Sequence, residues 1–160
     1  MVNYADHTFG VCKKMLDDKN AIMGLGDGGA HVGFILDAGY PTWLISYWSV
    51  KKRAYSMEET VRRLTSDTAN AAGLNDRGLL KVGLKADINI IDWENVGSSD
   101  PFMTQDLPAG GKRLMQNTQG YVTTIVSGKV TYKNGEFTKE RPGTVVKSVK
   151  DDEKTLEFTN

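Results

Sequence analysis

Apolar positions in the first twenty residues follow a helical spacing. Val11, Met15 and Leu16 fall on one side of the segment 11–20, and the charged residues Lys13, Lys14, Asp17, Asp18 and Lys19 fall on the other. This pattern predicts a short amphipathic helix.

A second helical pattern runs from Thr42 to Arg53. It follows Pro41, which suits a first helical turn or the turn before it. Its apolar and aromatic positions are Trp43, Leu44, Tyr47 and Trp48. We expect the two tryptophans to pack in the core.

Two further helices are predicted from their end signals. The sequence from Ser56 to Glu59 fits a capping box, in which the serine hydroxyl and the glutamate carboxylate each bind a free amide at the helix start. The residues 65–67 offer another N-cap, and Gly73 can end the helix 68–72 in a left-handed conformation.

Between the first two helical patterns lies a brief apolar run, residues 21–26, which leads into the sequence Asp27-Gly28-Gly29-Ala30-His31. An apolar run of this length before a glycine-rich loop is typical of a buried strand that ends in a loop.

After Asn75 the pattern changes to β structure. Residues 87–92 alternate between polar and apolar, which predicts a half-buried strand. The strands 121–126 and 129–132 are joined by Ser127-Gly128, and Asn134-Gly135 then predicts a type I′ turn into residues 136–138. This part of the chain therefore reads as a meander of hairpins.

The segment 96–120 lies between these strands and contains two prolines and three internal glycines. It is long for a plain loop, and long loops in compact domains are often lids or docking segments. We therefore expect it to serve as one of these.

Composition excludes several classes of function. The 160 residues carry 20 Lys+Arg and 20 Asp+Glu, so no broad basic face is expected and nucleic acid is a poor candidate partner. One Cys and two His cannot form a closed zinc cage, which takes about four ligands. No apolar run approaches the ~20 residues of a membrane span, and the first ten residues do not resemble a signal peptide. The expectation is a cytoplasmic protein that binds no membrane.

The candidate chemistry lies in the loop from Gly24 to His31. Asp27 follows the predicted strand, at the kind of strand end where barrel and open-sheet enzymes place catalytic groups. Two structural alternatives remain open, because Asp27 could cap the next turn and His31 could be an ordinary loop histidine. Cys12 is interpreted as a small hydrophobic residue, and the acids at positions 37, 67, 76 and 87 as residues that cap or end elements.

Several ordered blocks resemble the C-terminal part of metal-dependent amidohydrolases, in particular the N-acyl-D-amino-acid deacylase (D-aminoacylase) branch. The blocks are Gly26-Asp27-Gly28-Gly29-Ala30-His31, Leu64-Thr65, Ala69-Asn70-Ala71-Ala72-Gly73-Leu74, residues 77–87, Asp100-Pro101-Phe102, residues 120–130 and Arg141-Pro142-Gly143. Together they cover roughly residues 21–147, and their order makes the resemblance more specific than any single block.

The resemblance implies a fold and a chemistry. It implies the last βα unit of a (β/α)₈ barrel within residues 1–75, a small β-sandwich-like domain within residues 76–148 and a charged tail at residues 149–160. It also implies one or two divalent metals, usually zinc, with Asp27 as metal ligand and proton acceptor. His31, in the same loop, is a second candidate catalytic residue, although the resemblance itself assigns a role only to Asp27. The reaction would be hydrolysis of a non-peptide C–N amide bond in a small N-acyl amino acid.

The chain departs from this family in one respect that matters. A complete barrel takes about 250 residues, and the family's His-x-His, its bridging ligand and its later histidines have no counterpart here, since the only other histidine is His7. The chain alone is therefore expected to be weakly active or inactive.

Three interpretations stay open. The chain is a C-terminal portion of a deacylase that needs a missing barrel partner, or an independent binding or oligomerisation module, or a small hydrolase with a new site around Asp27 and His31. A lone barrel strand would also leave an apolar face uncovered, which predicts self-association. That face would be centred on Ile22, Leu25, Trp43, Leu44 and Trp48.

Overall fold

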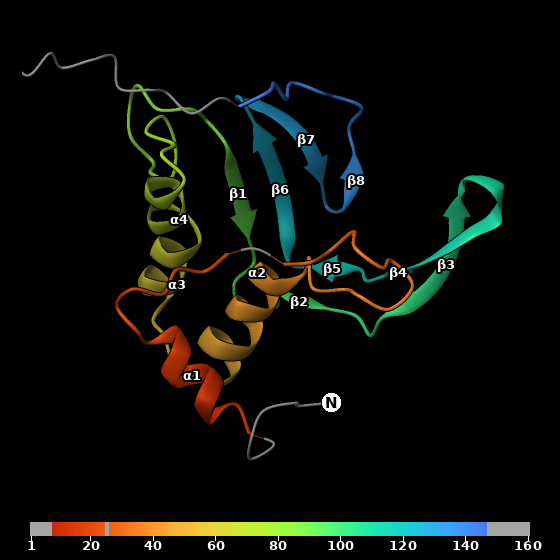
Figure 1. Cartoon of the computed structure of the whole chain (residues 1–160). Coiled ribbons are helices and arrows are strands. Elements are labelled where there is room, and N and C mark those ends of the chain that lie inside the picture. Colours follow the sequence, from red (N-terminus) through yellow and green to blue (C-terminus); the bar gives the residue numbers. More distant parts are fainter. Residues whose placement is uncertain (1–7, 25, 147–160) are drawn as a thin grey trace, which may run out of the picture.

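The computed structural model describes residues 8–24 and 26–146 as a mixed α/β chain. Helices occupy its first half and antiparallel strands its second half (Figure 1). The structure confirms a fold class that mixes helices and strands. The predicted tail, residues 149–160, lies outside the described residues.

The predicted helices are present. They are α1 (Gly10–Leu16), α2 (Tyr40–Trp43), η1 (Leu44–Lys51), α3 (Met57–Leu64) and α4 (Ser66–Ala71). Pro41 lies in the first turn of α2, as expected. Helix α2 runs directly into η1, which is wound as a π-helix; one such wide-turn bond joins Lys52 N–H to the Tyr47 carbonyl at 2.8 Å.

The predicted cap of α3 forms in part. The Ser56 hydroxyl accepts a hydrogen bond from the Glu59 amide at 3.1 Å. The Glu59 carboxylate pairs with Arg63 at 2.9 Å, one turn later in the helix. At the end of α4, Gly73 adopts φ +69°, which confirms the left-handed termination.

The predicted strand at residues 21–26 is wrong. Residues 21–24 and 26 form no strand in the described chain. Ala21 N–H bonds the Asp18 carbonyl at 2.9 Å, so the segment begins as the end of a turn. A strand forms only where a neighbour pairs with its backbone, and no described strand pairs with this segment.

The main sheet has four antiparallel strands in the order β1-β6-β7-β8. Their bounds are β1 (Ile88–Ile91), β6 (Tyr121–Val126), β7 (Lys129–Lys133) and β8 (Glu136–Phe137). Both hairpin predictions are confirmed. Ser127 and Gly128 in one turn, and Asn134 and Gly135 in the other, all have positive φ, as type I′ turns require.

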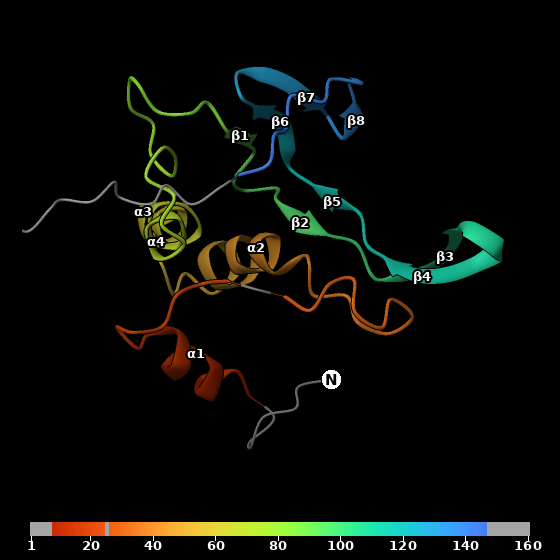
Figure 2. The same cartoon turned by 45° about the horizontal axis from the view of Figure 1, so that its top comes forward.

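The segment 96–120, which is too long for a plain loop by its sequence, consists mostly of paired strands, and its role as a lid or docking segment stays a prediction. It forms β2 (Gly97–Ser98), β3 (Phe102–Leu107), the 3₁₀ turn η2 (Pro108–Gly110), β4 (Gly111–Met115) and β5 (Thr118–Gln119). Strand β2 pairs with β5, and β3 pairs with β4 in a hairpin that projects from the rest of the molecule (Figures 1 and 2). Backbone pairing between strands therefore orders a segment whose prolines and glycines did not indicate strands.

The best-packed core lies among the helices. Leu44, Trp48 and Tyr55 are 0%, 5% and 5% exposed. The partly buried residues packed against them are Phe9, Cys12, Leu16, Met23, Tyr47, Ala54 and Leu64. The predicted uncovered face is therefore wrong at Leu44 and Trp48, which are buried in this cluster, whereas Ile22 and Trp43 remain 57% and 40% exposed. Residue 25 lies outside the described residues.

Tyr55 joins α1 to the segment between η1 and α3. Its hydroxyl donates to Asp17 at 2.9 Å, while Lys13 and Arg63 lie 4.5 Å and 4.6 Å from its ring centroid. Burial, followed by the bond to Asp17, raises the pKa of Tyr55 to about 12.

No helix within residues 8–24 and 26–146 is long and apolar enough to cross a membrane.

Candidate functional site

Asp27 lies at the start of a loop of consecutive turns. Its backbone N–H donates to the Asp37 carboxylate at 2.8 Å, and its carbonyl accepts from Ala30 N–H at 2.9 Å. The side chain is exposed, and its carboxylate has no hydrogen-bond or ion-pair partner among the described residues. Asp27 therefore does not act as a side-chain cap, and its carboxylate is free to bind a ligand.

Glycine is required at two positions of this loop because the backbone of residues 37–38 lies so close. A Cβ at Gly26 would lie 2.8 Å from the Asp37 carbonyl oxygen, and one at Gly28 would lie 2.8 Å from the Ala38 Cβ. The glycines beside Asp27 thus permit the close approach that brings the Asp37 carboxylate to the Asp27 amide.

His31 lies on the next turn of the same loop. It has φ +45°, is exposed, and stacks on Phe34 with ring centroids 5.1 Å apart. Its carbonyl accepts bonds from Phe34 and Ile35 N–H at 2.9 Å and 3.1 Å. Asp27 and His31 therefore share one exposed loop, but the structure gives no direct contact between their side chains.

The projecting hairpin is attached to this loop. Leu114 N–H in β4 donates to the Val32 carbonyl at 2.8 Å. Both views show the loop segment running beside the base of β4 (Figures 1 and 2). The hairpin therefore braces the loop immediately after His31.

Residues 8–24 and 26–146 contain no group of three or more His, Cys, Asp or Glu side chains that could hold a metal ion. A catalytic zinc site takes three protein ligands and one open position. Asp27 and His31 could supply at most two of these ligands. The side chains of this part of the chain thus do not complete a metal site by themselves.

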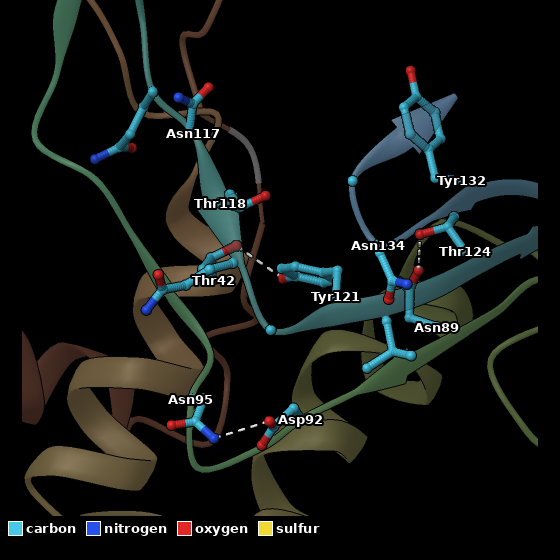
Figure 3. A pocket seen from close by; sticks show the side chains of 15 residues that line it. Thr42, Asn89, Asp92, Asn95, Asn117, Thr118, Tyr121, Thr124, Tyr132 and Asn134 are labelled. Atoms are coloured by element: carbon cyan, nitrogen blue, oxygen red, sulfur yellow. Dashed lines mark hydrogen bonds between the residues drawn. The ribbon is translucent and has the colours of Figure 1, made fainter. Parts of the chain in front are cut away.

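A polar cavity lies elsewhere, between the main sheet, the β2–β5 pair and α2 (Figure 3). Its volume is about 1120 Å³. The polar side chains around it are Thr42, Asn89, Asp92, Asn95, Gln116, Asn117, Thr118, Gln119, Tyr121, Thr124, Tyr132 and Asn134. Asp92 is the one charged residue of the lining, so the cavity is suited to a largely neutral ligand.

Three side-chain hydrogen bonds order the wall of this cavity (Figure 3). Thr42 and Tyr121 hydroxyls lie 2.8 Å apart and join α2 to β6. Thr124 donates to Asn89 at 2.9 Å across β6 and β1, and Asn95 donates to Asp92 at 2.9 Å. The side-chain amide of Asn134 forms no hydrogen bond to the described residues, so it is available to bind a ligand.

The sequence did not reveal this cavity or the role of Asp37. A signal existed for the cavity, because four consecutive polar residues, 116–119, precede Gly120 and the strand predicted at 121–126. Asp37 was interpreted as a residue that ends an element, whereas it holds the Asp27 amide across the loop. Nothing in its local sequence indicates that partner, which is 10 residues away.

Comparison with known proteins decides the family. A family model described as the amidohydrolase family matches residues 5–132. The chain belongs to the amidohydrolase family.

Curated relatives lie in more than one branch of the amidohydrolases. The chain is 32% identical to a dihydroorotase of Lactobacillus acidophilus over 89 residues, which are 53% of this chain and 20% of the relative. It is 37% identical to a dihydroorotase of Bacillus cereus over 89 residues, 52% of this chain and 20% of the relative. It is 29% identical to the N-acyl-D-aspartate deacylase of Alcaligenes xylosoxydans xylosoxydans over 96 residues, 60% of this chain and 18% of the relative.

The matches thus support the amidohydrolase family as a whole and not one branch of it. The chain spans about a fifth of the length of these relatives. No solved structure matches it.

Proposed function

We propose that this chain is the C-terminal portion of a metal-dependent amidohydrolase that hydrolyses the C–N amide bond of a small N-acyl amino acid. The observation that carries the proposal is the free, exposed carboxylate of Asp27 within the segment that matches the family. The N-acyl-D-aspartate deacylase among the relatives favours an N-acyl substrate.

In this proposal Asp27 accepts a proton from the attacking water and returns it to the leaving nitrogen. A carboxylate suits this role when it is held within hydrogen-bond reach of the proton that it accepts. Asp37 fixes the Asp27 backbone at 2.8 Å and leaves the side chain unpaired. His31, on the next turn, would bind or orient the acyl substrate.

The proposed metal is divalent, with zinc as the first candidate. Asp27 would be one ligand, and the remaining ligands would come from protein outside this chain, because the described residues do not supply three. In the same proposal, the segment before Asp27, which has no strand partner in the described chain, becomes the last strand of a (β/α)₈ barrel only when strands of the complete enzyme flank it. The sheet region would belong to a small β-sandwich.

The test combines metal binding with turnover. Mn²⁺ would be titrated into ¹⁵N-labelled chain, because this paramagnetic ion broadens the NMR signals of nearby residues. We expect weak binding that broadens residues 26–34 first and is lost in Asp27→Asn. The matched control is Asp18→Asn, since Asp18 is also an exposed acid in a turn, where it accepts the Asn20 amide at 2.8 Å.

Hydrolysis of N-acetyl-D-aspartate, N-acetyl-L-aspartate and dihydroorotate would be followed with and without added Zn²⁺. The chain alone should show no turnover above background. Turnover that Asp27→Asn abolishes would instead favour a small hydrolase with its own complete site. Broadening centred away from residues 26–34, or unchanged in Asp27→Asn, would contradict the role given to Asp27.

A second candidate function is an independent binding module. The observation that favours it is the ordered polar cavity of about 1120 Å³ shown in Figure 3. Neutral disaccharides such as cellobiose are suitable probes, because amide and hydroxyl groups bind sugar hydroxyls. Shifts at Asn134 and Tyr132 that disappear in Asn134→Ala would support this function; no shift with any probe would remove it.

A further inference from the structure

A second, smaller cavity lies beside the Asp27 loop, and its volume is about 490 Å³. This size falls within the range of small-molecule sites. It lies between the end of the loop, the α2–η1 helix and the connection from β2 to β3. The residues around it are Leu36, Asp37, Gly39, Tyr40, Trp43, Ser46, Ser98, Ser99, Asp100, Pro101 and Gln116.

One wall of this cavity is aromatic. Trp43 keeps 40% of its surface exposed, although the next residue, Leu44, is fully buried. Tyr47 stacks on it at a centroid distance of 4.8 Å and an interplanar angle of 5°, which fixes the indole plane. Tyr40, one turn earlier in the helix, also lines the cavity. The exposed part of a fixed indole is a preferred surface for an organic cation.

The charge of the lining is negative throughout. Asp37 and Asp100 are its charged residues, and no Lys, Arg or His belongs to the lining. One oxygen of Asp37 accepts the Asp27 amide, and the Asp100 carboxylate has no hydrogen-bond or ion-pair partner among the described residues. Two carboxylates without a basic neighbour attract a cationic ligand and repel an anionic one.

The remaining polar groups are hydroxyls and an amide. The Ser99 hydroxyl already has two partners. It donates to the Asp100 carbonyl at 2.9 Å and accepts a hydrogen bond from the Asn117 backbone N–H at 3.1 Å. Gln116 donates to the Ser99 carbonyl at 2.8 Å. These bonds hold the segment 98–101 in place at the side of the cavity opposite the helix. The site is therefore ordered on both sides.

We propose that this cavity binds the ammonium group of a small alkylammonium compound, between the indole of Trp43 and the carboxylates of Asp37 and Asp100. The site is distinct from the Asp27 carboxylate, and its existence does not depend on the proposed hydrolysis. Asp37 nevertheless serves both places, because it lines this cavity and holds the Asp27 amide.

Choline is the probe, and its neutral isostere 3,3-dimethylbutan-1-ol is the control ligand, because the two differ in charge and hardly in shape. Binding to the full chain would be followed by ¹H–¹⁵N NMR at the indole N–H signals of its three tryptophans, assigned with Trp43→Phe. We expect choline to shift the Trp43 signal with a dissociation constant on the order of 1–10 mM, and the isostere to bind about tenfold more weakly.

Asp100→Asn removes the unpaired carboxylate and keeps its shape. It should weaken choline binding about three- to fivefold, as expected for an exposed charge. Asp92→Asn is the matched control, since Asp92 lines the larger cavity and not this one, and this variant should leave choline binding unchanged. The ¹H–¹⁵N spectrum of each variant also reports whether it is folded.

Three results would overturn the proposal. These are equal binding of choline and its isostere, shifts that avoid Trp43, and loss of binding in Asp92→Asn but not in Asp100→Asn.

Discussion

The helical region and the sheet region of this chain are stabilised in different ways. In the helical region, Leu44, Trp48 and Tyr55 are nearly inaccessible and form one cluster. In the main sheet, Ile90, Val122 and Tyr132 remain 50%, 40% and 46% exposed. Side-chain burial therefore dominates among the helices, and backbone pairing dominates in the sheet.

The same difference appears along individual strands of the sheet. A sheet that packs one face on a core normally alternates buried and exposed residues, whereas strand β1 leaves Ile90 exposed between half-buried ends and β7 buries Thr131 alone. The helical region has a core of its own. We therefore expect substitutions to act more strongly among the helices than in the sheet.

The largest effect is expected for Leu44→Ala. Leu44 is 0% exposed and packs on Trp48 and Tyr55, so its loss leaves a cavity in the tightest part of the core. Urea unfolding followed by far-UV circular dichroism should show a loss of about 3–5 kcal/mol in the free energy of unfolding. The control is Leu80→Ala, at a side chain 85% exposed, which should change it by less than about 0.5 kcal/mol. Equal effects would contradict the burial pattern.

In the sheet region, the strongest effect should come from a glycine and not from an apolar side chain. A Cβ at Gly120 would lie 2.6 Å from the Val96 Cα, and the residue has φ +84°. Gly120→Ala should cost about 2–3 kcal/mol, since it adds a backbone clash to the strain of a positive φ. Gly135→Ala is the matched control, because Gly135 has φ +83° with open space around it.

The control isolates the strain alone, so Gly135→Ala should cost about 1 kcal/mol in the same measurement. If both variants lost the same stability, the close contact between Gly120 and Val96 would not contribute, and the sheet would be less tightly joined to the segment before β2 than the structure shows.

The sequence predicted the elements that local signals determine. Pro41, Ser56 and Gly73 marked helix ends correctly because caps and turns depend on a few adjacent residues. The turns at Ser127-Gly128 and Asn134-Gly135 were predictable for the same reason.

The sequence failed where the outcome depends on distant partners. The apolar run 21–26 is the kind of segment that forms a strand when other strands flank it, and no described strand does so. The sequence could not predict the pairing of β3 with β4 or the bond from Leu114 to Val32. Both depend on backbone N–H and C=O groups, which do not differ with the side chain. Asp27 and His31 were predicted as site residues; their shared exposed loop is now visible, and their chemistry remains a prediction.

Tyr55→Phe tests the link between α1 and the rest of the helical region. It removes the hydroxyl that donates to Asp17 at 2.9 Å, and should cost about 1–2 kcal/mol at neutral pH. The sheet region should be unaffected. Amide hydrogen exchange would check this, with faster exchange in residues 10–17 and unchanged exchange in β6.

The same variant should alter the alkaline stability profile. The pKa of Tyr55 is raised to about 12 in the folded chain, against about 10 for an unfolded tyrosine. A raised folded pKa gives stability that is fully present below pH ~10 and is lost as the pH rises towards 12. The wild-type chain should therefore lose more stability between pH 10 and 12 than Tyr55→Phe. Parallel profiles would contradict the burial of this hydroxyl.

The smallest effects compare one side-chain hydrogen bond from each region. Ser56→Ala removes the cap on the Glu59 amide, an orphan donor at the start of α3, and should cost about 1 kcal/mol in urea unfolding. Asn89→Ala removes the acceptor for Thr124 on an exposed sheet face, where water can replace it, and should cost less than about 0.5 kcal/mol. If Asn89→Ala cost as much as Ser56→Ala, that face of the sheet would be shielded from water, and the polar cavity that Asn89 lines would be more enclosed in solution than its exposed side chains indicate.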